Sequence, residues 1–408
     1  MHVVLLGSAF PGRRAAGVDR VHVRRALSLA VRVPVVVVVP TPWAPPALGG
    51  PSGRWARYAA TPKRAEIDGV RLLFPRYPQV PRMGPWAGAA MALGAMTTVR
   101  SLQRDRQCDI LFAQAVLPEG LAAVLIGRRL RVPVACLGRG TDVHGLPRAS
   151  ATTRRLAAWT LRHAAAVGVV ADALRRTLDG IGGGTPCTVL PNGVDLERFA
   201  PGSARDARRA LGIAEDARVI LYVGRLADGK GLDTLLEAFG VVRTAVPNAW
   251  LALVGSGPLQ ARLERRILAD GMARSVRLPG EAPHEVIPRW MQAADVVVLP
   301  SEAEGMPNVV REALACGRPV VATPVGDVPR VLSSDAGALV PPGNPAALAD
   351  ALATVLARPW DPDKIRALVS DMTWERNAEA TARFLASVVE AASAADFRRS
   401  SAPEAPAA

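Results

Sequence analysis

The sequence predicts an α/β protein with two doubly wound domains in tandem. Three observations support this fold class: short apolar runs alternate with helical stretches, the alternation occurs twice, and a turn-rich break separates the two series. Alternation of buried strands with helices predicts a parallel sheet covered by helices on both faces. A chain of 408 residues is long enough for two such domains, each with its own core.

The first series fills residues 1–192 and predicts an N-terminal domain. A loop rich in glycine and arginine, Ser8 to Val18, follows the first strand, at the sheet edge where open α/β sheets bind ligands. An ordinary connecting loop is an equal alternative. The expected strands are Val3–Leu6, Val35–Val39, Val70–Phe74, Ile110–Ala113, Val132–Leu137, Val167–Val170 and Thr188–Leu190, and the expected helices are Val18–Ala30, Ala89–Arg104 and Gly120–Arg129.

The second series fills residues 193–372 and predicts a C-terminal domain, entered through the turn-rich break at 180–186 and a linker at 190–202. The polar, proline-containing tail at 397–408 is expected to be disordered. The expected strands of this domain are Val219–Val223, Trp250–Val254, Val276–Leu278, Val296–Leu299, Pro319–Ala322 and Ala338–Val340.

The formal charge of +14 comes almost entirely from arginine, since Lys63, Lys230 and Lys364 are the only lysines. A basic balance predicts anionic partners. Nucleic acid is disfavoured because the basic residues are spread out and aromatic residues are few. The apolar and basic residues of 82–104 suit an anionic membrane surface, or equally a core helix with a solvated end.

The cysteines and the apolar runs indicate in which cell compartment the protein is expected. The four cysteines are scattered without a C-x-x-C pair, which argues against a zinc site and for a reduced, cytoplasmic protein. The most apolar run, 31–39, is too short to span a bilayer. We therefore expect a cytoplasmic location, with peripheral contact at the inner face of the membrane left open.

The stretch S-E-A-E-G-M-P-N-V-V-R-E-A-L-A-C-G-R-P at 301–319 follows a buried strand and begins a helix. Pro307 suits the first helical turn, and Asn308 is a capping residue type. Glu304 and Glu312 frame this helix start, where free N–H groups and the helix dipole hold anions such as a diphosphate. The alternative is a surface helix with two solvated glutamates.

The segment G-R-L-A-D-G-K-G at 224–231 follows another predicted strand and nearly matches a phosphate-binding P-loop. Gly231 stands where a Mg²⁺-binding hydroxyl is required, which argues against an NTPase. Arg225 and Lys230 still suit a diphosphate, and such cations stabilise the charge that grows on a diphosphate leaving group.

Three further motifs are weaker. Gly255-Ser256-Gly257 lacks the third glycine of a dinucleotide fingerprint and predicts a tight turn. The D-x-D at 361–363 lies in a proline-rich turn and predicts a helix start instead of a metal site. His144 is interpreted as the only histidine in a strand-end loop, with a structural or solvated role favoured.

Taken together, the motifs at 190–195 (L-P-N-G-V-D), 224–231 and 304–323 resemble those of GT-B glycosyltransferases of family 4, and members that build bacterial cell-surface polysaccharides such as teichuronic acid. This resemblance implies two Rossmann-like domains facing a cleft, and a nucleotide-sugar donor held mainly by the second. It implies independence of metal ions and cofactors, retention of anomeric configuration, and a lipid-linked or polysaccharide acceptor. It also implies that a C-terminal helix, about 373–396, crosses back to the first domain.

Residue roles follow from the resemblance alone. Arg225 and Lys230 would contact the diphosphate, Glu304 the donor-sugar hydroxyls and Glu312 the ribose hydroxyls. Gly17 resembles the glycine that lets the first loop approach the donor. Backbone N–H groups would cap the phosphates and sugar along Gly305, Met306, Pro307, Asn308 and Val309.

This chain departs from the family pattern at Arg139, which stands where many members have histidine. Arginine does not act as a base, so its catalytic role shifts towards binding the leaving phosphate or an anionic acceptor. Two alternatives to a transferase stay open: a GT-B nucleotide-sugar epimerase, and a non-catalytic nucleotide-sugar-binding protein.

Overall fold

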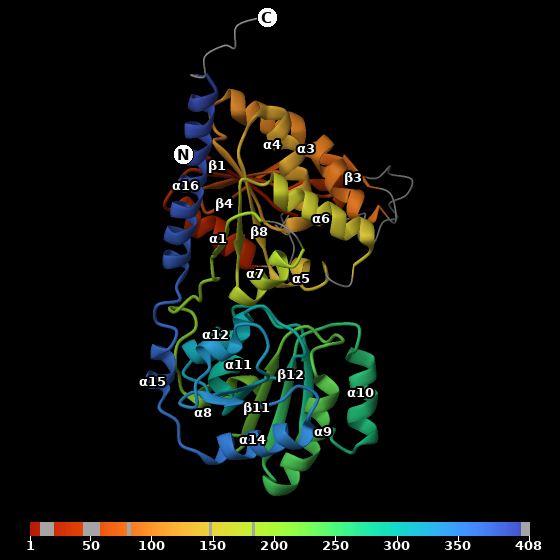
Figure 1. The fold of residues 1–408 in the computed structure, drawn as a ribbon. Coiled ribbons are helices and arrows are strands. Elements are labelled where there is room, and N and C mark those ends of the chain that lie inside the picture. Colours follow the sequence, from red (N-terminus) through yellow and green to blue (C-terminus); the bar gives the residue numbers. More distant parts are fainter. Residues whose placement is uncertain (9–19, 44–57, 80–82, 147–148, 182–183, 401–408) are drawn as a thin grey trace, which may run out of the picture. The chain divides into compact units, whose positions relative to one another are not determined.

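The computed structural model describes residues 1–8, 20–43, 58–79, 83–146, 149–181 and 184–400. The chain divides into two compact units (Figure 1). Unit 1 comprises residues 1–191 and the segment from residue 374 onwards, and unit 2 comprises residues 192–373. The division falls one residue from the boundaries expected from the sequence.

Unit 1 contains an eight-stranded sheet of order β10-β9-β8-β7-β1-β2-β5-β4, in which only β4 is antiparallel to its neighbour. A separate two-stranded sheet pairs β3 with β6. The strands are β1 (Val3–Leu6), β2 (Val35–Val38), β3 (Thr41–Trp43), β4 (Arg64–Ile67), β5 (Val70–Leu73), β6 (Arg76–Pro78), β7 (Ile110–Ala113), β8 (Val134–Gly138), β9 (Ala166–Val169) and β10 (Cys187–Val189).

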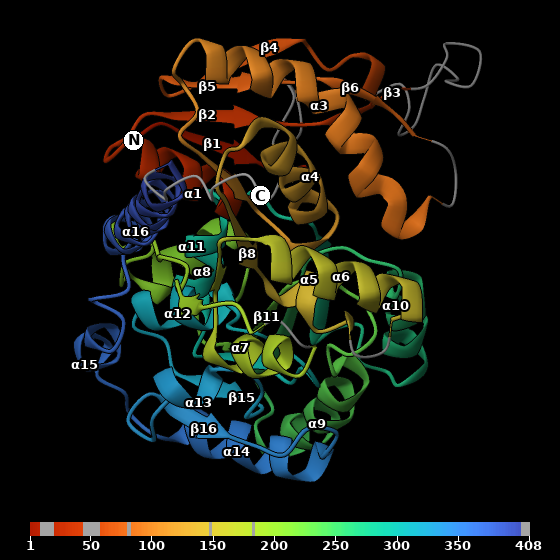
Figure 2. The same ribbon diagram turned by 45° about the horizontal axis from the view of Figure 1, so that its top comes forward.

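Helices cover both faces of this sheet. One face carries α1, with α16 packed against it, and the other carries α3, α4 and α6 (Figures 1 and 2). The helices of unit 1 are α1 (Arg20–Ala30), η2 (Gly84–Trp86), α3 (Ala87–Arg104), η3 (Val116–Gly120), α4 (Leu121–Leu130), α5 (Gly140–Val143), α6 (Ala151–His163), α7 (Asp172–Asp179) and α16 (Trp374–Ser400).

Unit 2 is a fully parallel six-stranded sheet of order β13-β12-β11-β14-β15-β16. Its strands are β11 (Arg218–Val223), β12 (Ala249–Val254), β13 (Val276–Gly280), β14 (Val296–Leu299), β15 (Val320–Ala322) and β16 (Gly337–Leu339). Its helices are α8 (Ala204–Leu211), α9 (Leu232–Ala245), α10 (Gln260–Ala269), α11 (Ile287–Ala293), α12 (Asn308–Ala315), α13 (Val328–Val331), α14 (Pro345–Ala357) and α15 (Pro362–Ala367).

The central strands are apolar because both of their faces are buried. All four residues of β1, β7 and β14 are buried, as continuous valine and leucine runs predict for parallel strands between helix layers. In unit 2, α9 and α14 pack against one another, and α12 packs on β14 and β15. The predicted α/β class is confirmed, and the expected buried strands lie within two residues of the observed ones.

Three expectations need correction. The sheet of unit 1 is not purely parallel, because β4 and β5 form a hairpin through Asp68 and Gly69, both at positive φ. Pro307 occupies the N-cap position in extended backbone, so α12 begins at Asn308 instead. The C-terminal helix α16 extends to Ser400, beyond the expected start of the tail at 397, and residues 401–408 lie outside the described residues.

Candidate functional site

The candidate site of unit 2 lies where the strand order reverses. β11 and β14 are neighbours at the centre of the sheet, and from them the chain winds outwards in opposite directions. In open α/β sheets, ligands bind at this switch point, outside the carboxyl ends of the strands. The loop 224–231 follows β11 and the loop 300–307 follows β14, so both predicted motifs meet at this edge.

Lys230 and Glu304 form an ion pair between these two loops, with Nζ 2.6 Å from Oε1. The backbone N–H of Glu302 donates to the carbonyl of Gly229 (2.9 Å), which joins the loops directly. Gly231 has a φ of 65°, and a Cβ there would lie 2.0 Å from the carbonyl oxygen of Pro300. Glycine at 231 therefore lets the loops approach closely enough to pair the lysine with the carboxylate.

Arg225 lies in the same loop and lines a cavity of about 490 Å³ at the ends of β11, β12 and β13. The other lining residues are Val223, Gly224, Val254, Gly255, Ser256, Gly257, Glu281, Ala282 and Ile287. The polar side chains of its lining are those of Arg225, Ser256 and Glu281. An exposed guanidinium on such a wall is suited to bidentate binding of an oxyanion. Gly255 and Gly257 precede a turn at Pro258 and Leu259, where the N–H of Gln260 donates to the carbonyl of Gly257 (3.2 Å).

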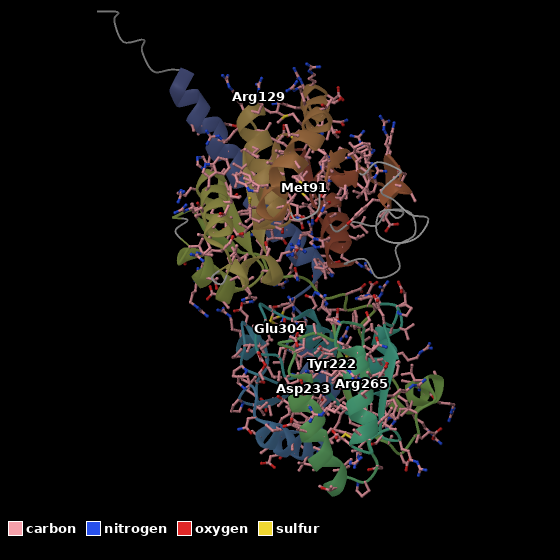
Figure 3. The ribbon with its side chains drawn as sticks, turned by 90° about the vertical axis from the view of Figure 1, so that its right-hand side faces the viewer. Met91, Arg129, Tyr222, Asp233, Arg265 and Glu304 are labelled. Carbon is pink, nitrogen blue, oxygen red and sulfur yellow. The ribbon has the colours of Figure 1, made fainter. Side chains whose placement is uncertain are left out.

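Tyr222 holds this loop through a hydrogen bond that was not predicted from the sequence. The residue is fully buried in β11, and its hydroxyl donates to the carbonyl of Arg225 (2.9 Å). Burial, and secondarily the charge of Glu304, raise the pKa of Tyr222, so the hydroxyl stays protonated as a donor. Figure 3 labels Tyr222 and Glu304 in unit 2.

The first turn of α12 follows the loop that carries Glu304. No side chain caps its first turn, so the N–H groups there have no side-chain acceptor. The preceding loop is fixed by the backbone N–H of Asp327, which donates to the carbonyl of Gly305 (2.8 Å). A Cβ at Gly326 would lie 2.0 Å from that same carbonyl oxygen, so this contact also requires glycine. The segment from Gly305 to Val309 is therefore held at the switch point, at a helix start.

The side chain of Asn308 does not cap the helix, although the residue type allows it. Its Oδ1 accepts hydrogen bonds from Nη2 of Arg311 (2.9 Å) and Nδ2 of Asn192 (3.0 Å). Nη1 of Arg311 also donates to the carbonyl of Asn192. This arrangement ties the start of unit 2 to the first turn of α12.

Glu312 contacts His284 and not the ion pair of Lys230 and Glu304. Its Oε1 lies 3.6 Å from Nε2 of His284, and Arg198 donates to Nδ1 of the same ring (3.1 Å). Because a guanidinium can only donate, Nδ1 is the acceptor and Nε2 carries the hydrogen that faces the carboxylate. His284 follows β13 in the chain. The interpretation of His144 as the only histidine in a strand-end loop was therefore wrong, and His144 itself ends helix α5.

Arg139 belongs to unit 1, at the carboxyl end of β8. Its side chain contacts His22, and its backbone N–H donates to Oδ1 of Asp142 (2.7 Å). Burial raises the pKa of Asp142 to about 7, despite the N–H of Val116 that also donates to it. The last predicted site residue, Gly17, lies outside the described residues.

The described part of the chain contains neither a cluster suited to a metal ion nor a membrane-spanning helix. Within it, no group of three or more His, Cys, Asp or Glu residues is placed to hold a metal ion. Asp361 caps helix α15 by accepting from the N–H groups of Asp363 and Lys364, as the sequence predicted. No helix among the described residues combines the length and the apolar character needed to cross a bilayer.

Two family models match the chain, one in each half. Residues 203–369 match the model for glycosyl transferases group 1, and residues 35–198 match the model for glycosyltransferase family 4. A Bacillus subtilis protein named as a teichuronic acid biosynthesis glycosyltransferase, TuaC, is 27% identical over 355 residues, which cover 86% of this chain and 88% of that protein.

A second relative is the D-inositol 3-phosphate glycosyltransferase of Geodermatophilus obscurus, which is 41% identical over 199 residues. That alignment covers 46% of this chain and 44% of the relative, so the chain matches less than half of its length.

Solved structures share the fold at low sequence identity. Sucrose-phosphate synthase from Thermosynechococcus elongatus has a TM-score of 0.74 at 23% identity, covering 95% of this chain and 99% of that one. Anabaena HepE in complex with UDP-glucose has a TM-score of 0.69 at 19% identity, covering 94% and 99%. The motifs, the two family models and the fold agree: the chain belongs to glycosyltransferase family 4, has the GT-B fold and is a glycosyltransferase.

Proposed function

We propose that this enzyme is a retaining glycosyltransferase that moves a sugar from a nucleoside-diphosphate sugar to a lipid-linked or polysaccharide acceptor in cell-surface glycan synthesis. One observation carries the proposal: Lys230 and Glu304 are paired at the switch point of unit 2, beside the uncapped start of α12. The likeness to HepE, solved with UDP-glucose, supports the donor class. The likeness to TuaC supports the cell-surface role.

The donor diphosphate would lie between the loop after β11 and the first turn of α12. Lys230 supplies a point charge and Arg225 a planar guanidinium, while the helix start supplies N–H groups and a positive dipole end. Of the segment 305–309, Pro307 has no N–H to give, so the N–H groups of Gly305, Met306, Asn308 and Val309 serve this purpose. Together these groups supply the positive charge that a diphosphate requires, and we propose that the reaction needs no metal ion.

The two glutamates would bind the sugar and the ribose of the donor. Glu304 accepts hydrogen bonds from the sugar hydroxyls, because its carboxylate sits beside the lysine that holds the phosphate. Glu312 accepts from the ribose hydroxyls, with His284 beside it. In this scheme the acceptor hydroxyl oxygen forms a bond to the anomeric carbon while the bond from that carbon to the diphosphate oxygen breaks. The electron pair leaves on the diphosphate, and a diphosphate oxygen takes up the hydroxyl proton. Lys230 and Arg225 stabilise that growing negative charge.

For the acceptor side we propose unit 1, where Arg139 contacts His22 at the carboxyl end of β8. A guanidinium there suits an anionic acceptor or the leaving phosphate. The four cysteines of the chain are free thiols, which supports a cytoplasmic location. Peripheral contact with the inner face of the membrane belongs to the same proposal.

A thermal-shift screen against nucleotide sugars tests the donor class first, because a ligand that binds only the folded state raises the melting temperature. We expect one sugar nucleotide to raise it and its free sugar to have no effect. Incubation with that donor and an acceptor should then yield a glycoside with the donor's anomeric configuration, equally in EDTA. The proposal fails if no nucleotide sugar stabilises the protein, or if the donor alone is isomerised and never transferred.

A further inference from the structure

Arg311 is a buried cation in the first turns of α12. Its side chain is 1% exposed, and it is among the largest fully buried side chains of the described residues. Burial lowers its pKa to about 10, against the charges of Glu312 and Asp327, so the guanidinium remains charged at neutral pH. A buried charge is costly unless something compensates it.

The compensation in this structure is incomplete. Nη2 donates to Oδ1 of Asn308 (2.9 Å) and Nη1 donates to the carbonyl of Asn192, but both acceptors are neutral. Nε has no hydrogen-bond partner. The charges of Glu312 and Asp327 act on the guanidinium, but neither carboxylate accepts one of its hydrogen bonds. Arg208, also buried in unit 2, differs in this respect because it pairs with Asp295 at 2.7 Å.

The direction of the Arg311 side chain places its charge near the start of α12. Side chains on a helix lean towards its N-terminus, and Arg311 reaches back one turn to the side chain of Asn308. The guanidinium therefore lies beside the helix start, where the free N–H groups and the dipole already favour an anion. A buried cation in this position adds positive potential in a region of low dielectric, where charges are weakly screened.

We infer that Arg311 is a positioning residue for the donor diphosphate: its charge strengthens anion binding at the start of α12, and its hydrogen bonds hold Asn308 and Asn192 in place. Its role is indirect, because the guanidinium is covered by protein. The inference rests on the proposed function. It identifies which buried residue makes this helix start a stronger anion site than an uncapped helix alone.

The test compares anions of different charge. We would measure the affinities of UDP, UMP, GDP and inorganic pyrophosphate for the wild-type chain and for Arg311→Gln, which keeps a donor group and removes the charge. We expect Arg311→Gln to weaken diphosphate binding on the order of tenfold and monophosphate binding by less, since the lost interaction scales with ligand charge. Arg311→Lys, which keeps the charge, should restore most of the diphosphate affinity.

The control is Arg208→Gln, which removes a buried, ion-paired arginine near Asp295, at the amino end of β14. It should lower the melting temperature and leave diphosphate affinity unchanged. Equal weakening of UMP and UDP in Arg311→Gln, or no weakening, overturns the inference. If Arg311→Gln does not fold, the affinities of Arg311→Met for UDP and UMP are compared in the same way. An Arg311→Lys variant that folds but does not bind diphosphate also overturns the inference. A wild-type chain that binds none of these anions would instead overturn the proposed function.

Discussion

The two sheets of this protein share a doubly wound arrangement and differ in the chemistry at their switch points. In unit 2, the loops after β11 and β14 present a lysine and a glutamate, both partly accessible, beside an uncapped helix. In unit 1, β1 and β7 are the corresponding neighbours, and there the backbone and hydroxyl of Ser8 donate to Glu119, which is 2% exposed. Gln114, at the end of β7, is fully buried, and both polar atoms of its side chain lack partners.

The comparison shows that the sheet topology determines where a candidate site lies, and that the side chains there determine which ligand it can bind. Both switch points gather polar groups, because parallel strands end at one edge in each sheet. The cations and uncapped N–H groups of unit 2 suit a diphosphate, whereas the polar side chains at the switch point of unit 1 include the buried Glu119 and Gln114. Substitutions at the switch point of one unit, compared with substitutions in the other unit, therefore test whether the donor binds to unit 2.

The largest effect is expected for Lys230→Ala. Loss of a cation that stabilises the leaving diphosphate should lower kcat for transfer at least ~100-fold, as removal of one transition-state contact typically does. The measurement is the initial rate of glycoside formation with a saturating donor. Lys364→Ala is the matched control, because that lysine is highly exposed on α15 and should be replaceable without effect. Wild-type turnover in Lys230→Ala would contradict the assignment.

The next effect concerns stability and arises in unit 1. The pKa of Asp142 is raised to about 7 by burial, from 3.8 in the unfolded chain. Between these values the folded state holds a proton that the unfolded state releases, so stability should fall as the pH rises from about 4 to 7. At about 1.36 kcal/mol for each pKa unit, the full shift corresponds to about 4 kcal/mol. It is measured as the difference in unfolding free energy between the wild type and Asp142→Asn at each pH.

The control for this prediction is Asp105→Asn, which changes an exposed carboxylate in the same unit. Its difference from the wild type should vary little over the same pH range. A difference between the wild type and Asp142→Asn that stays constant from pH 4 to 7 would show that Asp142 is not the titrating group.

A smaller effect is expected for Arg225→Gln. The guanidinium lines the cavity beside β11, so its loss should raise the donor KM about tenfold and change kcat less, as removal of one charged contact to a phosphate does. Steady-state kinetics in donor separate the two constants. Arg265→Gln, on α10 (Figure 3), removes the same charge elsewhere in unit 2 and should leave KM unchanged. An equal rise in KM for both variants would indicate general electrostatics.

The smallest effect is expected for Tyr222→Phe. This variant deletes the buried hydrogen bond to the carbonyl of Arg225 and should cost about 1 kcal/mol of stability. It should also raise the donor KM slightly, because that bond holds the cavity wall. Tyr77→Phe deletes a hydroxyl bond to Gln79 in unit 1 and should affect stability alone. Donor binding that is equally sensitive to both variants would contradict a role for Tyr222 at the site.

Much of the fold was predictable from the sequence because buried parallel strands are written as continuous apolar runs, as in β1 and β14. The strands that were not predicted are β3, β4 and β6, which lack such a run. The side chains of β4 alternate between exposed and half-buried at the sheet edge. The signal that was overlooked is the turn at Asp68 and Gly69, since an Asp-Gly pair is typical of a tight hairpin.

The site was predictable only in part. Lys230 and Glu304 lie 74 residues apart, and their contact follows from the sheet order and the family motifs, not from local pattern. Arg311 was not found, because an arginine in a short helix is ordinarily solvated and nothing local indicates burial. Tyr222 and His284 were missed for a related reason: their roles depend on which loops pack against them.

The most direct test of the central claim is calorimetric titration of the wild type, Lys230→Ala and Glu304→Ala. Each is titrated with the sugar nucleotide selected by the thermal-shift screen and with the matching nucleoside diphosphate. If Lys230 holds the diphosphate and Glu304 the sugar, Lys230→Ala weakens both ligands, whereas Glu304→Ala weakens only the sugar nucleotide. Unchanged affinities in both variants, or equal weakening of the nucleoside diphosphate by Glu304→Ala, would contradict the account.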